Sequence, residues 1–363
     1  MLGVYILSAG RGFGMLFFET QWCLPVWTGV ACAVVLPFVM TATQMGSHQT
    51  LVWLNIATLS GTVLIPLCYY QVFGTDEIRG TGDGSVVRWT PVEEFDSSKV
   101  LSSLSTFAFG MTSQFMLVEI IAEMKEPDEL PRAYIHQSAP FQLAAFVVAG
   151  LGGYYYFGDQ AWGMINDNLP FNLSIRLAAF CLLIHMLITY VIKGVVISRV
   201  FFFSFAGRLW GDVPRVEECW RARILWNFIG IVLLAWVWVF TNLVPFFSDA
   251  VDLLGASLTP ISCFLMPIAM YLRFLYDAGP EVRSRVPWWE WILMAMTLAL
   301  ALLLVFFGTA SSLGNLREHW KNSGYPFQCH CTGLWDTCEC SAGHAGMLDQ
   351  CPSQDVGGHT LAG

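Results

Sequence analysis

A glycine-centred polar segment and two glutamates interrupt one long apolar stretch of this sequence. The segment reads Gly110-Met-Thr-Ser-Gln114, and Glu119 and Glu123 follow it within a second apolar run. A carboxylate inside a lipid-spanning run is costly, so we expect it to face a protein interior or a water-filled path. A break in a membrane helix frees backbone groups, and discontinuous helices of this kind form ligand sites. This stretch is therefore the first candidate for chemistry.

Polar residues recur around this segment at alternating steps of three and four. Residues at these spacings lie on one face of a helix. The predicted stripe consists of Ser102, Ser105, Thr112, Glu119 and Glu123, with Phe109 and Met116 between them. One face of the predicted helix thus carries hydroxyl groups and both carboxylates.

Three ionisable residues of the apolar runs are candidates for proton or cation transfer. Glu119 and Glu123 would form a relay or a gate, although Glu123 also suits a solvated helix end close to Lys125. His185 lies near the middle of Leu173–Arg199 and would either transfer protons or remain neutral and hydrogen-bonded in the core. These alternatives stay open at the level of sequence.

Other charged residues receive structural interpretations. Asp249 and Asp252 follow Pro245 between two apolar runs, where helix caps or exposed turn residues are expected. Lys193 lies near the end of its run and can extend its ammonium group toward the interface. We assign no chemistry to these three residues.

The composition indicates a membrane protein. Of the 363 residues, 55% are hydrophobic and only 12% are charged, whereas soluble domains contain about 25% charged residues. The 18 Lys and Arg residues are scattered, which excludes a nucleic-acid-binding surface. No secretory signal is evident, because Met1 opens directly into an apolar run without a basic segment.

Enzyme signatures are missing from the sequence. The patterns G-x-S-x-G, H-E-x-x-H and Walker A do not occur, which argues against a hydrolase, a metalloprotease and an ATPase. A membrane-embedded enzyme that uses His185 with Glu119 is a weak alternative, since neither residue belongs to a catalytic motif. We therefore expect no catalytic residues, no metal ligands and no cofactor.

Eight apolar runs are long enough to cross a bilayer, which takes about 20 mostly apolar residues. We expect spans at Leu24–Ala42, Leu51–Phe73, Val100–Met124, Pro140–Phe157, Leu173–Arg199, Ile224–Phe247, Val251–Tyr271 and Trp288–Thr309. A ninth run, Met1–Phe18, is shorter, is interrupted by Gly10-Arg11-Gly12, and looks like the end of a span. The predicted fold is an all-α integral membrane protein, a multi-span helical bundle.

The charges of the loops predict the orientation of the chain in the membrane. With Met1 entering from the cytoplasm, ten Lys and Arg residues fall on the cytoplasmic side and seven on the opposite side, which favours an extracytoplasmic C-terminus. We divide the chain into a transmembrane domain, residues 1–316, and a tail, residues 317–363. Disulfides suit the five tail cysteines on an oxidising side, with zinc binding or disorder as alternatives, and an odd number leaves one cysteine over.

Several groups of residues resemble one family of transporters. Phe107-Ala-Phe-Gly110, with the later Glu123-Met-Lys-Glu-Pro127, resembles the sixth membrane helix of the amino acid/auxin permease family. Further matches follow the family's order: Gly3–Arg11, Gly152–Gly158, and Val244–Asp249 with Leu254–Ala256. The resemblance covers nearly all of the chain up to about Leu316. The family belongs to the amino acid–polyamine–organocation superfamily, which has the LeuT-type fold.

The resemblance implies a fold and a site. In the LeuT-type fold, helices one to five and six to ten form inverted repeats, and the substrate lies between broken helices one and six. The family's first helix carries G-x-G-x-L-x-x-P, and Gly10–Gly14 lacks the L-x-x-P that should follow. We therefore expect a partial LeuT-type fold lacking the first two helices and part of the third, from a truncated or incompletely predicted gene. Half of the substrate site would then be absent.

The implied function is secondary active transport of amino acids, coupled to H⁺ or Na⁺, by alternating access around Gly110–Gln114. Backbone groups at this break would hold the carboxylate and ammonium of the substrate. The predicted substrate-binding residues are Phe107, Phe109, Gly110, Thr112 and Ser113, and the predicted coupling or gating residues are Glu119, Glu123 and His185. The competing interpretation is a continuous helix that tolerates a glycine and packs both phenylalanines.

The implied partners are an amino acid substrate and the lipid bilayer, and no nucleic acid. The protein would be a multi-pass protein of the plasma membrane or of the vacuolar or lysosomal membrane. The alternative is a non-transporting truncated membrane protein or an amino-acid sensor. The sequence identifies no protein partner.

Overall fold

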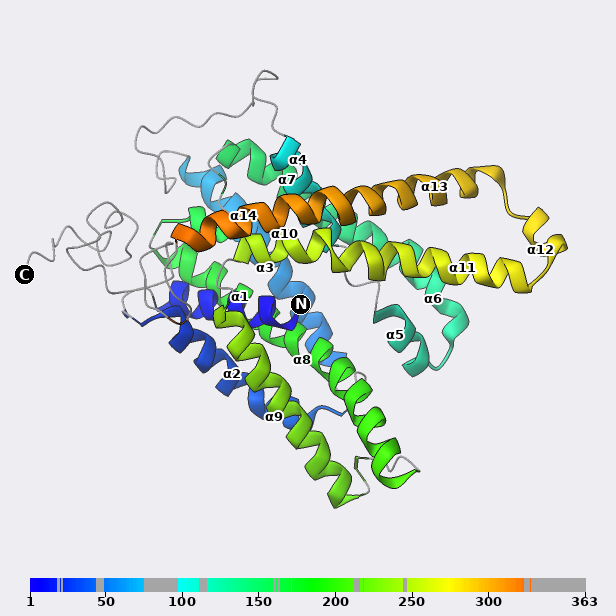
Figure 1. The fold of residues 1–363 in the computed structure, drawn as a ribbon. Coiled ribbons are helices and arrows are strands. Elements are labelled where there is room, and N and C mark those ends of the chain that lie inside the picture. The colour runs from blue at the N-terminus through cyan, green and yellow to red at the C-terminus, as the bar shows by residue number, and fades with distance from the viewer. Residues whose placement is uncertain are drawn as a thin grey trace, which may run out of the picture. The chain divides into compact units, whose positions relative to one another are not determined.

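The computed structural model describes residues 1–17, 20, 22–43, 49–74, 97–110, 116–158, 161, 164–170, 172–211, 216–217, 219–243, 247–322 and 327. Every regular element in these residues is a helix, and no strand occurs among them. This confirms the predicted all-α fold. The helices divide into two compact units (Figure 1). The first comprises Met1–Thr90, Glu123–Pro245 and Gly324–Gly363, and the second comprises Pro91–Ala122 and Phe246–Ser323.

The first unit is built around α8, which runs from Leu173 to Trp210. The helices that pack on α8 are α1 (Leu2–Leu16), α2 (Leu24–Thr41), α3 (Gln49–Phe73) and α9 (Trp220–Leu243). The core that α1, α2, α8 and α9 share contains Ile6, Val35, Phe202 and Trp226, all at most 2% exposed. Burying these large apolar side chains fixes α1, α2 and α9 against α8.

Shorter elements complete the first unit. α7 (Ala139–Phe157) packs on α3, and η7 (Ile165–Asn168) lies against α3 and α8. Three short helical elements precede α7: η4 (Pro127–Glu129), α6 (Leu130–Ala133) and η5 (Tyr134–Ser138). They carry the charged residues that follow Glu123.

α1 is a continuous helix through Gly10-Arg11-Gly12, the residues that interrupt the apolar run in the sequence. The reason is packing against α2. A Cβ atom at Gly10 would lie 2.6 Å from Cγ2 of Thr28, a distance that only a missing side chain permits. A glycine inside a helix costs about 1 kcal/mol relative to alanine, and the close approach of the two helices offsets that cost here.

The second unit contains a long antiparallel pair of helical segments. One segment consists of α10 (Phe247–Ala256), η8 (Pro260–Leu265) and α11 (Met266–Asp277), and the other of α13 (Trp288–Leu303), η9 (Leu304–Gly308) and α14 (Thr309–Asn322). The short helix α12 (Pro280–Ser284) joins them, as Figure 1 shows. α4 (Ser97–Gly110) packs mainly on α10. α5 (Leu117–Glu123) follows α4 in the chain.

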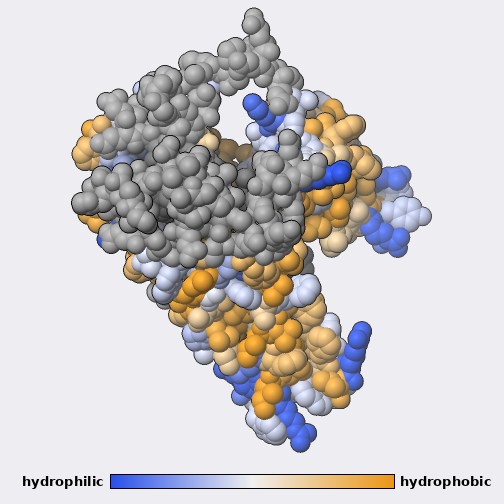
Figure 2. All heavy atoms as spheres, turned by 60° about the vertical axis from the view of Figure 1, so that its left-hand side comes forward, coloured by the Kyte–Doolittle hydropathy of each residue, from blue (hydrophilic) through white to orange (hydrophobic). Residues whose placement is uncertain are grey.

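Six helices in the described ranges are long and apolar enough to cross a membrane: Leu24–Thr41, Leu51–Phe73, Leu173–Trp210, Trp220–Leu243, Val251–Asp277 and Trp288–Arg317. They confirm an integral multi-pass membrane protein. Most described residues on the face drawn in Figure 2 are apolar, and hydrophilic residues gather in small patches. Such a surface suits lipid rather than water.

Several predicted spans differ in their bounds from the observed helices. Within Val100–Met124 the structure describes α4 up to Gly110 and α5 from Leu117, and residues 111–115 between them lie outside the described residues. The helix predicted to end at Arg199 continues for 11 more residues to Trp210 and ends at Gly211, where φ is +75°. At 1.5 Å per residue, α8 is about 57 Å long, whereas the hydrocarbon core is about 30 Å thick. One end of α8 must therefore extend beyond the hydrocarbon core.

Cys23, the residue before α2, is disulfide-bonded. The other described cysteines are free: Cys32, Cys68, Cys181, Cys219 and Cys263. Disulfides persist on the oxidising side of a membrane, and the extracytoplasmic side of the start of α2 stays a prediction. The five tail cysteines lie outside the described residues.

Candidate functional site

The predicted break lies between two described helices. α4 ends at Gly110, whose surface is exposed, and α5 begins at Leu117. The last carbonyl groups of an α-helix lack partners within the helix and carry partial negative charge. The residues that follow Gly110, 111–115, lie outside the described part of the chain, and Thr112 and Ser113 are among them.

The face of α4 that carries the predicted stripe packs on α10 at very short range. A Cβ atom at Gly255 of α10 would lie 1.9 Å from the carbonyl oxygen of Ser105 and 3.2 Å from Cβ of Phe109. Only a glycine allows this approach of two helices. Ser105 is fully buried, and its hydroxyl donates to the Leu101 carbonyl at 2.8 Å.

This contact encloses a carboxylate. Asp252 of α10 is 8% exposed and lies three residues, about one turn, before Gly255. The Ser102 hydroxyl donates to Oδ2 of Asp252, and the Thr106 hydroxyl donates to Oδ1. Ser102 and Thr106 are four residues apart on α4, so both reach α10 from one face.

Asp252 corrects a sequence prediction. We expected a helix cap or an exposed turn residue, and Asp252 is instead the sixth residue of a helix and is buried. The physical reason is that α10 starts at Phe247, earlier than the predicted Val251, so Asp252 lies inside the helix. The side chain of Asp249 lies outside the described part of the structure.

Further hydroxyl groups surround the α4–α10 contact. A Cβ atom at Gly308 of η9 would lie 3.2 Å from both Ser105 Oγ and Ala256 Cβ. Ser98 and Ser311 are hydrogen-bonded through their hydroxyls at 2.8 Å. The buried hydroxyls of Thr259 and Thr309 find no hydrogen-bond partner among the described residues. The interior of the second unit is thus more polar than an ordinary apolar core.

The two predicted pocket phenylalanines face different ways. Phe109 is partly buried against Gly255, as a packing role requires. Phe107 is 54% exposed on the surface of its unit. Of the two side chains, Phe107 is therefore the more exposed.

The predicted relay residues do not come together among the described residues. The side chain of Glu119 is outside the described part. Glu123, which groups with the first unit, forms an ion pair with Arg199 of α8, with Glu123 Oε1 at 2.5 Å from Arg199 Nη1. The two side chains are 23% and 18% exposed, so the pair is partly shielded from water. Glu123 is therefore ion-paired with Arg199 as well as partly solvated.

His185 lies on α8, in the first unit, where α8 packs on α3. Its Nδ1 atom is buried and has no hydrogen-bond partner among the described residues. The same holds for Thr189 Oγ1, one turn later, and for Asn55 Oδ1 of α3. The predicted hydrogen-bonded core histidine is therefore incomplete at Nδ1. Lys193, one turn after Thr189, donates to the Tyr5 hydroxyl of α1 rather than reaching only toward the interface.

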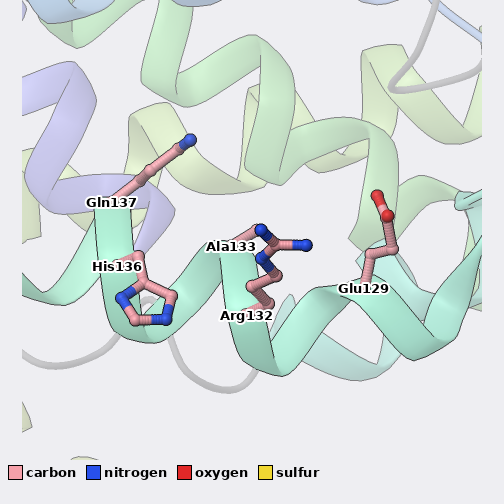
Figure 3. A pocket seen from close by; sticks show the side chains of 5 residues that line it. All are labelled: Glu129, Arg132, Ala133, His136 and Gln137. Atoms are coloured by element: carbon pink, nitrogen blue, oxygen red, sulfur yellow. The ribbon is translucent and has the colours of Figure 1, made fainter.

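One surface hollow lies outside these sites. It has a volume of about 500 Å³, and its described lining is Glu129, Arg132, Ala133, His136 and Gln137. All five come from one helical segment, and their side chains do not converge on a point (Figure 3). No group of three or more His, Cys, Asp or Glu side chains suited to a metal occurs in the described residues.

Comparisons with known proteins agree with the membrane fold. The model of the family described as transmembrane amino acid transporter protein matches residues 4–313. The amino acid transporter AVT1D of Arabidopsis thaliana is 22% identical over 226 residues, which make up 61% of this chain and 37% of that protein. The chain thus spans little more than a third of this relative's length. No solved structure matches the chain.

Proposed function

The chain belongs to the transmembrane amino acid transporter protein family, and on this premise we propose that it moves amino acids across a membrane by secondary active transport. A chain of this family is a transporter rather than an enzyme. The single observation that supports the proposal most is the family match over 310 residues, from 4 to 313. It covers both structural units.

The proposed substrate site lies at the C-terminal end of α4. In a helix that is broken after Gly110, the last carbonyl groups would attract the ammonium group that every amino acid carries. Gly110 leaves the helix end open to a ligand, and Phe107 supplies an exposed aromatic surface. Thr112 and Ser113 follow within five residues of chain and would add hydroxyl groups. Phe109 packs on Gly255 and so helps to hold the end of α4 against α10.

The proposed transport cycle is alternating access coupled to H⁺ or Na⁺. Glu119 and His185 are the proposed coupling residues, because both are ionisable groups in apolar helices. Glu123 suits a gate better, since it is ion-paired with Arg199 of α8. A gate of this kind opens when the ion pair breaks. The proposed locations are the plasma membrane and the vacuolar or lysosomal membrane.

Binding and uptake measurements test the proposal. The purified chain is placed in nanodiscs for binding of radiolabelled amino acids, and in liposomes for uptake with a pH or Na⁺ gradient. Saturable uptake of at least one amino acid, lost in Gly110→Val, supports transport. Saturable binding without uptake supports the sensor alternative. A folded chain that neither binds nor moves any of the 20 amino acids contradicts both.

A further inference from the structure

We propose that Asp252 takes up the coupling proton, and that Ser102 and Thr106 hold its carboxyl group in both protonation states. The inference rests on the proposed function, because it assigns a proton-binding residue to that transport cycle. It adds Asp252 to the coupling residues that the sequence predicted. The argument uses contacts within the second unit only.

The position of Asp252 makes its charge costly. It is 8% exposed and belongs to the membrane-spanning segment Val251–Asp277. An ionised carboxylate in such a segment costs several kcal/mol unless it is compensated, and uptake of a proton removes the charge. Ionisable residues in this situation mark ion and proton pathways. The hydroxyl donors of Ser102 and Thr106 partly compensate the ionised form.

The partners of Asp252 can serve both protonation states. A hydroxyl group both donates and accepts hydrogen bonds. In the ionised state, Ser102 and Thr106 each donate to one carboxylate oxygen. When a proton binds, an O–H bond forms on one of these oxygens and no covalent bond breaks. The new O–H group then donates to the facing hydroxyl oxygen, so the contact between α4 and α10 persists.

The displaced hydroxyl hydrogen has an acceptor within α4. Ser103 donates to the Lys99 carbonyl at 2.9 Å, and Ser105 donates to the Leu101 carbonyl at 2.8 Å, each four residues earlier. Ser102 and Thr106 can turn their hydroxyls to the equivalent carbonyls in the same way. Proton binding therefore leaves no hydroxyl hydrogen without an acceptor.

Among the described side chains at the contact of α10 with its neighbours, Asp252 is the acidic one. The elements that pack on α10 are α4, η9 and α14. Their described ionisable side chains are Lys99 of α4 and Arg317 of α14, both exposed. The side chains of Asp249 and of residues 318–322 are outside the described part. Thr106 is itself exposed, so the carboxyl group is one hydrogen bond from the surface of the unit.

A proton suits this site better than a sodium ion. A proton binds to one oxygen atom, whereas a metal cation needs several oxygen ligands arranged around it. Both carboxylate oxygens already accept hydroxyl hydrogens. Accumulation driven by Na⁺ and indifferent to pH would therefore contradict the proposal.

Infrared spectroscopy tests the proton site without requiring transport. The purified chain is titrated with pH, and the carbonyl stretch of protonated carboxyl groups is followed in difference spectra. We expect Asp252→Asn to remove one component of this band and Asp277→Asn to leave that component in place. Asp277 is the matched control, because it is an exposed residue of the same span, paired with Arg273. An unchanged band in folded Asp252→Asn would overturn the proposal.

Transport assays supply the second readout. A gradient of about one pH unit can drive about tenfold accumulation of a substrate that moves with one proton. We expect Asp252→Asn to lose this accumulation but to retain exchange of labelled for unlabelled amino acid, which requires no net proton movement. Retained accumulation would overturn the proposal.

Two failures can be told apart. If the wild-type chain moves no amino acid, the transport function fails, while the infrared result still decides the proton site. If Asp252→Asn does not fold, Ser102→Ala replaces it. Loss of one hydrogen bond to the carboxylate should move the pH midpoint of the same infrared component upward, and an unmoved midpoint would count against the assigned partners.

Discussion

The close contact between α4 and α10 can be tested with one methyl group. In Gly255→Ala, the new Cβ atom would lie 1.9 Å from the Ser105 carbonyl oxygen, whereas ordinary contact begins at 3.4 Å. The two helices must therefore separate by about 1.5 Å at this point. Asp252 lies one turn away, so at least one of its bonds to α4 would stretch beyond hydrogen-bond distance, about 3.5 Å.

The cost follows from two terms. Overpacking costs about 1–3 kcal/mol, and losing one hydrogen bond to a charged group costs about 1.5–3 kcal/mol. Together they lower the free energy of unfolding of the second unit by roughly 4 kcal/mol. At about 2–4 °C per kcal/mol, the melting temperature should fall by about 10 °C.

Thermal melting of the purified variants in detergent measures this loss. Gly314→Ala is the matched control, because Gly314 lies in α14 of the same unit and a Cβ atom there would meet nothing within 4 Å. Alanine stabilises a helix interior by about 0.5–1 kcal/mol relative to glycine, so this control should melt no lower than the wild type. If Gly255→Ala also melts like the wild type, the close approach of α4 and α10 is refuted.

Three further predictions concern the proposed site, the gate and the disulfide. Gly110→Val should reduce amino acid uptake to background while expression and gel-filtration behaviour stay normal, because a β-branched side chain blocks the end of α4; near-normal uptake would remove Gly110 from the site. A double-mutant cycle of Glu123→Gln and Arg199→Gln should give a coupling energy of about 1 kcal/mol, as expected for a partly exposed pair, and additive single effects would show no coupling. Peptide mapping without reduction should link Cys23 to a peptide from residues 328–363, because the other five described cysteines are free; finding Cys23 as a free thiol would contradict it.

The sequence was sufficient to predict the membrane class and most spans. Apolar runs near 20 residues leave few alternatives to membrane helices, and α2, α3 and α9 begin and end within four residues of their predictions. The end of α8 was missed because Arg199 was taken as a membrane boundary. The residues that follow it, Phe201-Phe-Phe-Ser-Phe205, remain helical. Charge marks where the membrane ends and does not mark where a helix ends.

The sequence predicted which residues share one face of α4, but it did not predict that this face packs on α10. Ser102, Ser105 and Phe109 do lie on one face, because helical spacing is a local property. Their contact with α10 joins residues about 150 positions apart, as in the bond between Ser102 and Asp252. Nothing in one sequence pairs such distant residues. The local signal that was available is the spacing of Asp252 and Gly255, an acid and a glycine one turn apart on an apolar helix.

Asp252 and Gly255 connect the charge of a carboxylate to the packing of α10 on α4. Gly255 sets how closely α10 approaches α4, and this distance decides whether the hydroxyls of Ser102 and Thr106 reach Asp252. A separated α10 would leave the carboxylate without these donors, and a carboxylate without donors favours the protonated form. Loosening of the α4–α10 contact should therefore favour proton uptake, and by reciprocity a bound proton weakens this contact without breaking it. Since α4 ends at the proposed substrate site, this linkage gives a proton on Asp252 a physical route to affect substrate binding at Gly110.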